Sequence, residues 1–148
     1  MSEHIVKIIT SDPLTVIPEA ALTKVQKFLE ANIRCNGINL ENNEFPMFID
    51  CGSNLEKISC PECGTEIDFD WWGEKMNEAS ENSFQKLDIT LPCCKKSSAL
   101  NLLRYYYECG FSCLSIEILE PADDISLSLL SELENMLGTP LKIINSHI

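Results

Sequence analysis

The strongest constraint on what this chain can fold into is a pair of cysteine-containing segments that lie far apart in the sequence. Residues 59–64 read SCPECG, and residues 91–96 read LPCCKK. A Cys-x-x-Cys segment on a tight turn directs two thiolates to one point, and a tetrahedral zinc site needs four such ligands. We therefore predict a metal site formed by the cysteines of both segments, which are Cys60, Cys63, Cys93 and Cys94.

A glycine follows the second cysteine of the first segment. Gly64 has no Cβ, so the chain can turn there and bring amide N–H groups close to the sulfurs. The segment CPECG, through Cys60, Pro61, Cys63 and Gly64, resembles the metal-binding knuckle of zinc-ribbon and rubredoxin-type proteins. Because the resemblance covers only this short turn, it implies a metal-binding turn and does not assign the whole chain to a family.

Two alternating segments predict how the distant cysteines meet. Apolar residues alternate with polar residues in 65–71 and again in 86–92, as they do in half-buried strands. If these strands pair antiparallel, the end of the second returns beside the start of the first. The resulting hairpin would bring the adjacent cysteines of the second segment to Cys63.

The adjacency of Cys93 and Cys94 leaves one ligand of the predicted site undecided. Neighbouring residues of an extended strand point to opposite sides, so both can bind one metal only if the chain bends after Pro92. Cys51, upstream of the first segment, is the alternative to one of them. Four thiolates accept zinc or iron. We predict zinc in a structural role, because a four-cysteine site leaves no open coordination position.

Hydrophobic periodicity outside these segments indicates further helices and strands. Apolar residues recur at spacings of three and four after Pro18, after Ser97 and after Asp124, which predicts three helices. The β-branched residues of 4–10 predict a strand near the N-terminus. The helix after Asp124 has a predicted strand on each side.

This order of elements predicts an α+β fold. The strand, helix and strand over residues 111–147 form a βαβ unit, so we expect the two strands to be parallel with a right-handed crossover. We predict a single domain over residues 1–148, with a mixed sheet and helices on one face of it. The zinc-binding β-hairpin would be an insertion at about 57–96.

The charge of the chain argues against nucleic acid as a partner. Its 11 basic and 23 acidic residues give a formal net charge of −12 at pH 7, which is the wrong sign for neutralising phosphates. Such a charge can instead steer the chain toward a basic protein. We expect no membrane segment and no secretory signal, hence a cytoplasmic protein. In that compartment eight cysteines favour metal binding or burial over disulfides.

Trp72 is the candidate recognition residue. In an extended strand Trp71 and Trp72 point to opposite faces, so we expect Trp71 in the core and Trp72 at the surface, and tryptophan is enriched in binding hot spots. The remaining cysteines, Cys35, Cys109 and Cys113, are expected to act as small buried apolar residues.

The sequence contains no catalytic motif that we recognise. No Ser-His-Asp set, Gly-rich phosphate loop or His-rich centre is visible. The leading hypothesis is therefore a non-enzymatic protein-protein interaction module with a structural zinc site, of the antidote, immunity or adaptor type. The alternative is a thiol-dependent redox protein or enzyme that uses the cysteine cluster. CPEC also resembles the Cys-Pro-x-Cys of dithiol redox proteins, but their reactive thiol opens a helix, and the residues after CPEC are strand-like and acidic.

Overall fold

A four-stranded sheet forms the larger part of the protein. The computed structural model describes residues 4–52 and 55–147, and its main sheet has the strand order β2-β8-β1-β9. The strands are β1 (His4–Thr10), β2 (Gly37–Ile49), β8 (Gly110–Leu119) and β9 (Leu141–His147). Strand β8 is central and is buried along nearly its whole length. The prediction of an α+β fold is confirmed.

Neighbouring strands of this sheet pair only antiparallel, which corrects the expected mixed sheet, although the two strands of the expected C-terminal βαβ unit are parallel, as predicted. Strand β1 lies between β8 and β9 and is antiparallel to both. The two strands of the predicted unit therefore run in the same direction but do not touch. The N-terminal strand β1 lies between them. It has apolar residues on both of its faces, and an interior position in the sheet buries both faces.

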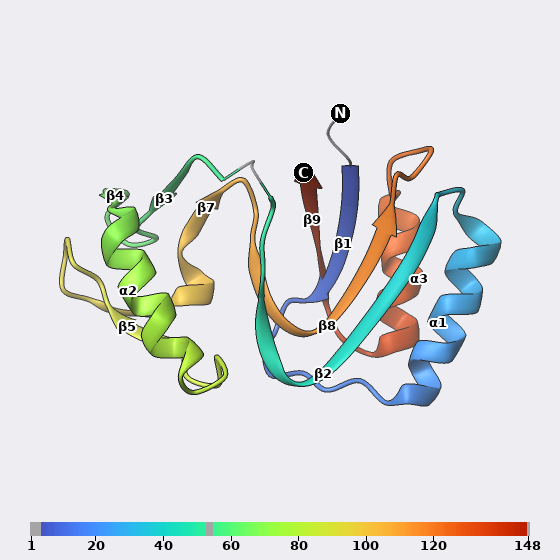
Figure 1. Cartoon of the computed structure of the whole chain (residues 1–148), viewed down its shortest axis with the longest axis horizontal. Coiled ribbons are helices and arrows are strands. Elements are labelled where there is room, and N and C mark those ends of the chain that lie inside the picture. The colour runs from blue at the N-terminus through green and yellow to red at the C-terminus, as the bar shows by residue number, and fades with distance from the viewer. Residues whose placement is uncertain (1–3, 53–54, 148) are drawn as a thin grey trace.

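Two helices cover one face of the sheet (Figure 1), as predicted. They are α1 (Glu19–Asn32) and α3 (Leu127–Leu137). Helix α1 buries Leu22, Val25 and Leu29, the stripe that its periodicity predicts. Ser126 is the N-cap of α3, and its hydroxyl accepts a hydrogen bond from the Leu129 N–H at 3.1 Å. The same core includes apolar side chains from β1 and β8.

The chain between β2 and β8 forms a second group of elements, which we call the cysteine lobe (residues 50–109). Figure 1 shows it beside the main sheet, on the side away from α1 and α3. Its elements are β3 (Lys57–Ser59), β4 (Glu66–Ile67), α2 (Phe69–Ser80), β5 (Asp88–Thr90), β6 (Ser97–Ala99), a 3-10 turn (Leu100–Leu102) and β7 (Arg104–Tyr106).

The segment predicted as a strand over residues 65–71 is a strand only at Glu66–Ile67, and its last residues begin helix α2 at Phe69. Asp68 accepts a hydrogen bond from the Asp70 N–H at 2.9 Å and thereby caps α2. Trp72, Met76 and Ala79 then pack against one core at helical spacing. The alternation of Phe69 and Trp71 that suggested a strand is therefore local, and the longer helical stripe and the cap determine the structure.

The predicted hairpin between 65–71 and 86–92 is also replaced. Strand β4 pairs with β3, and β5 pairs with β6, each antiparallel. The predicted helix after Ser97 is absent, because these residues form β6, the 3-10 turn and β7. Strand β7 pairs with β3. Residues 97–106 have apolar residues at helical spacing, but pairing with strands outside this segment makes β6 and β7 extended.

The cysteine lobe and the main sheet share a hydrophobic core. Phe111 and Ile144 of the sheet belong to the same buried cluster as Ile58 and Leu91 of the lobe. The Phe48 ring, at the end of β2, lies 5.3 Å from the Phe111 ring and 5.7 Å from the Trp72 ring, measured between centroids. This shared core fixes the lobe against the sheet.

Candidate metal centre

The first cysteine segment forms a tight turn between β3 and β4. The Cys60 N–H donates to the Thr65 carbonyl at 2.8 Å, and the Gly64 N–H donates to the Cys60 carbonyl at 3.0 Å. Gly64 has a φ of +78°, a conformation that glycine adopts without a steric penalty. The tight turn that the sequence predicts is therefore present, and we call residues 60–65 the first knuckle.

The second cysteine segment repeats this turn between β5 and β6. The Leu91 N–H donates to the Lys96 carbonyl at 2.9 Å, and the Lys95 N–H donates to the Leu91 carbonyl at 3.0 Å. Lys95 has a φ of +63° at the position that corresponds to Gly64. Leu91-Pro92-Cys93-Cys94 thus aligns with Cys60-Pro61-Glu62-Cys63, so a leucine occupies the position of the first cysteine.

The repeated turn explains how adjacent cysteines reach one site. Cys94 occupies the position of Cys63, the second cysteine of the first knuckle. Cys93 occupies the position of Glu62 and supplies the sulfur that Leu91 cannot. Because residues 92–94 are a turn and not an extended strand, the two side chains need not point to opposite sides. The bend at Pro92 that the sequence required is present.

The four sulfurs lie close enough together to share one metal ion. The Sγ atoms of Cys63 and Cys93 are 3.3 Å apart, and those of Cys60 and Cys94 are 3.9 Å apart. All four lie within 4.8 Å of one another. A zinc-sulfur bond of about 2.3 Å gives sulfur-sulfur edges of about 3.8 Å in a tetrahedron. These separations fit a metal ion and exceed the roughly 2 Å of a disulfide bond.

Hydrogen bonds favour the thiolate form on the first knuckle. Burial opposes ionisation of Cys60, but the N–H groups of Cys63 and Glu62, at 3.4 and 3.3 Å from its sulfur, outweigh burial and lower its pKa. The hydroxyl and the backbone of Thr65 lower the pKa of Cys63 to about 6. Such bonds stabilise metal-bound thiolates in the same way.

Cys93, in the second knuckle, holds its proton more strongly than Cys63 does. The hydrogen bond between Cys93 and Cys63 raises the pKa of Cys93 to about 12. The two exposed thiols therefore share one proton at neutral pH, because the first ionisation disfavours the second. A bound cation would remove this conflict by neutralising both sulfurs.

The site is buried on one side and open on the other. Cys60 is buried and Cys94 is half-buried, whereas Cys63 and Cys93 are exposed. Ile58 and Leu91, both fully buried, belong to the core beneath the two turns. Both residues belong to the same buried cluster, so each turn is anchored in one core.

Cys51, the alternative ligand, does not join the cluster. Its sulfur lies 3.4 Å from the sulfur of Cys109, and both side chains are buried. Within residues 4–52 and 55–147, the four cysteines of the knuckles are the one group of three or more potential ligands close enough to share a metal. The expected burial of Cys109 and Cys113 is confirmed, whereas Cys35 is half-buried.

Trp72 is not placed as the sequence predicted. It is half-buried among the rings of Phe48, Phe69 and Tyr105, and its Nε1-H donates to the Tyr105 hydroxyl at 3.2 Å. Trp71 lines an open groove of 820 Å³ between α2 and the β5-β6 hairpin. The expectation of an exposed Trp72 depended on strand geometry, which residues 69–80 do not have.

The outer face of α2 carries an acidic stripe that the sequence analysis missed. Its carboxylates recur at helical spacing and are all exposed: Asp70, Glu74, Glu78 and Glu81. Lys75 offsets part of this charge through a 3.4 Å contact with Glu78. The spacing was visible in the sequence, but it has a meaning only once these residues are known to be helical.

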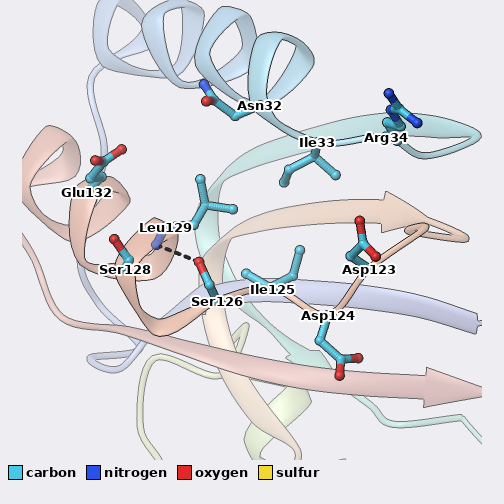
Figure 2. Close-up of a pocket in the computed structure, with 10 residues that line it drawn as sticks. All are labelled: Asn32, Ile33, Arg34, Asp123, Asp124, Ile125, Ser126, Ser128, Leu129 and Glu132. Carbon is cyan, nitrogen blue, oxygen red and sulfur yellow. Dashed lines mark hydrogen bonds between the residues drawn. The ribbon is translucent and has the colours of Figure 1, made fainter.

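A separate pocket lies between the end of α1 and the start of α3 (Figure 2). It has a volume of 320 Å³, and Figure 2 shows Arg34 near one end with Asp123 and Asp124 across from it. The amino terminus of α3 favours anions there, whereas these carboxylates and Glu132 repel them. The lining thus carries one positive and three negative side chains, so it does not favour an anion despite the helix amino terminus.

Comparisons of the chain with protein-family models, with curated proteins and with solved structures found no match. The likeness of CPECG to a zinc-ribbon knuckle thus stays a resemblance of one turn. Among the helices of the described residues, none has the length and apolar content needed to cross a membrane.

Proposed function

We propose that the protein binds one zinc ion through Cys60, Cys63, Cys93 and Cys94, and that the ion has a structural role. The observation that carries this proposal is the convergence of four sulfurs within 4.8 Å of one another. Four protein ligands fill a tetrahedral zinc site and leave no position for a substrate. The two knuckles lie on strands of different small sheets, and these sheets do not pair with each other in the described part of the chain. A zinc ion bound to both knuckles would link these two sheets.

Metal analysis tests the zinc proposal directly. We expect about one zinc per chain in protein purified without chelators. Cys60→Ser should lose the metal, because Cys60 is a buried ligand. Cys35→Ser is the matched control, since Cys35 lies outside the cluster and should leave the zinc content unchanged. The absence of both zinc and iron from native protein would refute the proposal.

We further propose that the zinc-ordered lobe is a non-enzymatic interaction module for a basic protein. The net charge of −12 and the acidic stripe on α2 support this function. Like charges at i and i+4 destabilise a helix. A cationic partner would therefore reduce the repulsion among the carboxylates of α2. A toxin-binding antidote, an immunity protein and an adaptor would all use such a surface.

A charge-neutralising variant tests the interaction surface. The triple change Glu74→Gln, Glu78→Gln and Glu81→Gln should reduce recovery of a basic partner from cell extract at least tenfold. The triple change Glu30→Gln, Glu41→Gln and Glu132→Gln is a matched control, because it removes the same charge from exposed positions outside α2. Recovery should also fall as salt rises from about 0.05 to about 0.5 M. Equal loss in both variants would contradict a role for α2.

One observation favours the alternative, a thiol-dependent redox protein. Cys63 and Cys93 are exposed and their sulfurs are 3.3 Å apart. Against it, CPEC lies in a turn between two strands, so no helix amino terminus activates its first thiol. Thiol-dependent turnover that Cys63→Ser abolishes, with unchanged zinc content and melting temperature, would favour the redox function over the structural one.

A further inference from the structure

A second pair of cysteines lies at the junction of the cysteine lobe and the main sheet. The pairing of β2 with β8 ends at Ile49 and Gly110. Cys51 lies two residues after Ile49, and Cys109 lies directly before Gly110, so both are on the segments that connect the sheet to the lobe. Their sulfurs are 3.4 Å apart, and the side chains are 0% and 1% exposed. We call these segments, residues 50–51 and 108–109, the neck.

Two lysines of the main sheet hold the neck segments in place. The Lys7 ammonium donates to the Asp50 carbonyl at 3.1 Å. The Lys142 ammonium donates to the Cys109 carbonyl at 2.7 Å and forms an ion pair with Glu108 at 2.8 Å. One lysine therefore fixes each segment through its backbone, and the two thiols are held in contact with little freedom to separate.

The surroundings of the pair favour a bond between the two sulfurs over a metal ion. Both sulfurs also lie near the Tyr107 carbonyl, at 3.8 Å from the Cys51 sulfur and 3.6 Å from the Cys109 sulfur. Two thiols do not complete a tetrahedral site. The two sulfurs are 3.4 Å apart and would have to approach by about 1.4 Å to reach the roughly 2 Å of a disulfide.

We propose that Cys51 and Cys109 form a reversible disulfide that locks the neck when the protein meets a peroxide. One thiol takes an oxygen from hydrogen peroxide and becomes a sulfenic acid, with release of water. The sulfur of the other thiol then displaces that oxygen as a second water and forms the S–S bond. The pair loses two electrons and two protons to one peroxide, and a small dithiol returns both thiols to the reduced form.

The environment of the pair protects it under resting conditions. Burial and the hydrogen bond with Cys51 raise the pKa of Cys109 to about 12, so its thiolate is scarce at neutral pH. The oxidation should therefore be slower than that of a surface thiol and should accelerate as pH rises. Such a pair responds to sustained oxidation and not to brief exposure.

The disulfide would enclose the candidate metal centre in a closed loop. The loop of about 60 residues from Cys51 to Cys109 contains all four cysteines of the knuckles. Closing a loop of this size lowers the entropy of the unfolded chain, which should raise the melting temperature by about 5–15 °C. The inference does not depend on the zinc proposal, because the neck thiols lie outside the cluster.

Mass spectrometry of peroxide-treated, folded protein tests the proposal. We expect a loss of about 2 Da that a dithiol reverses, with unchanged zinc content. Cleavage after glutamates places Cys51 in fragment 45–56 as its sole cysteine, and Cys109 in fragment 109–117 together with Cys113. We expect these two fragments to be linked, and the link to persist in Cys113→Ala but to disappear in Cys109→Ala.

The same experiment has outcomes that would overturn the inference. A link between Cys63 and Cys93 in place of the neck disulfide would do so, as would fragment 45–56 remaining unlinked after peroxide treatment at pH 9. An unchanged melting temperature in protein with the mapped disulfide would refute the lock. The wild-type fragment map does not require any variant to fold, so the test stands even if Cys109→Ala is unstable.

Discussion

The zinc proposal makes a quantitative prediction about stability. A ligand that binds only the folded chain adds RT ln(1 + [L]/Kd) to the free energy of unfolding, which is about 1.4 kcal/mol for each tenfold rise in free zinc above Kd. For 148 residues, 1 kcal/mol corresponds to about 3 °C in melting temperature. We therefore expect about 4 °C per decade of free zinc, and about 12 °C over three decades.

The protein contains a natural probe for this measurement. Its two tryptophans, Trp71 and Trp72, both lie in α2 of the cysteine lobe. Tryptophan emission during thermal melts, in solutions where a chelator fixes free zinc, therefore follows the lobe that contains the four clustered cysteines. Because the lobe shares a core with the main sheet, melts followed by backbone circular dichroism should shift in parallel.

The slope also identifies the stoichiometry and the ligands. A melting temperature independent of free zinc would refute the structural role, and a slope twice as steep would indicate two ions. Cys94→Ser should flatten the dependence, because it removes the sulfur that lies 3.9 Å from that of Cys60. A Cys113→Ser variant should keep the full slope, since Cys113 is buried outside the cluster.

Three further predictions follow from local geometry. Lys95→Gly should stabilise the protein by about 1 kcal/mol in thermal melts, because a φ of +63° is sterically unfavourable for lysine but not for glycine. A lower melting temperature would contradict this reading of the second knuckle. Gly110→Ala should destabilise by about 1–3 kcal/mol in urea titrations, because the new Cβ would meet a buried isoleucine of β1 at 2.5 Å. Gly73→Ala, which meets nothing within 4 Å, should instead stabilise α2 by up to about 1 kcal/mol, and the opposite order would refute both assignments. Zinc binding near pH 8 should release the proton of Cys93, whose pKa is about 12, but none from Cys63, whose pKa is about 6. Below pH 6 Cys63 must also lose a proton, so zinc affinity should fall more steeply there in competition titrations, and a constant slope would contradict the assignment.

The sequence predicted the elements of the main sheet more reliably than those of the cysteine lobe. The stripe of Leu22, Val25 and Leu29 defines α1 by its own periodicity, and one face of the helix is indeed buried. Residues 97–106 have a similar spacing but form short strands, because β3 and β5 offer them partners. Local patterns decide long amphipathic helices, whereas short strands depend on partners that the local sequence does not reveal.

The four clustered cysteines were predicted although the predicted path of the chain between them was wrong. Ligand chemistry depends on residue type and on tight turns, and both were visible in SCPECG and LPCCKK. The intervening chain forms α2 and two separate hairpins, so the knuckles meet through packing of their apolar residues and not as two ends of one hairpin. The proximity of Cys51 and Cys109 was not predictable. These residues are far apart in the sequence, they belong to no common motif, and they meet only where β2 and β8 leave the sheet.

The alignment of the two knuckles explains the asymmetry of the site. In the first knuckle Cys60 is a buried residue at the start of the turn, and its sulfur faces the site. In the second knuckle the same position holds Leu91, whose side chain joins the core instead. The missing sulfur must then come from Cys93, at a position where the first turn has the exposed Glu62. Leu91 thus places its side chain in the core, and one sulfur of the cluster, that of Cys93, lies at the surface.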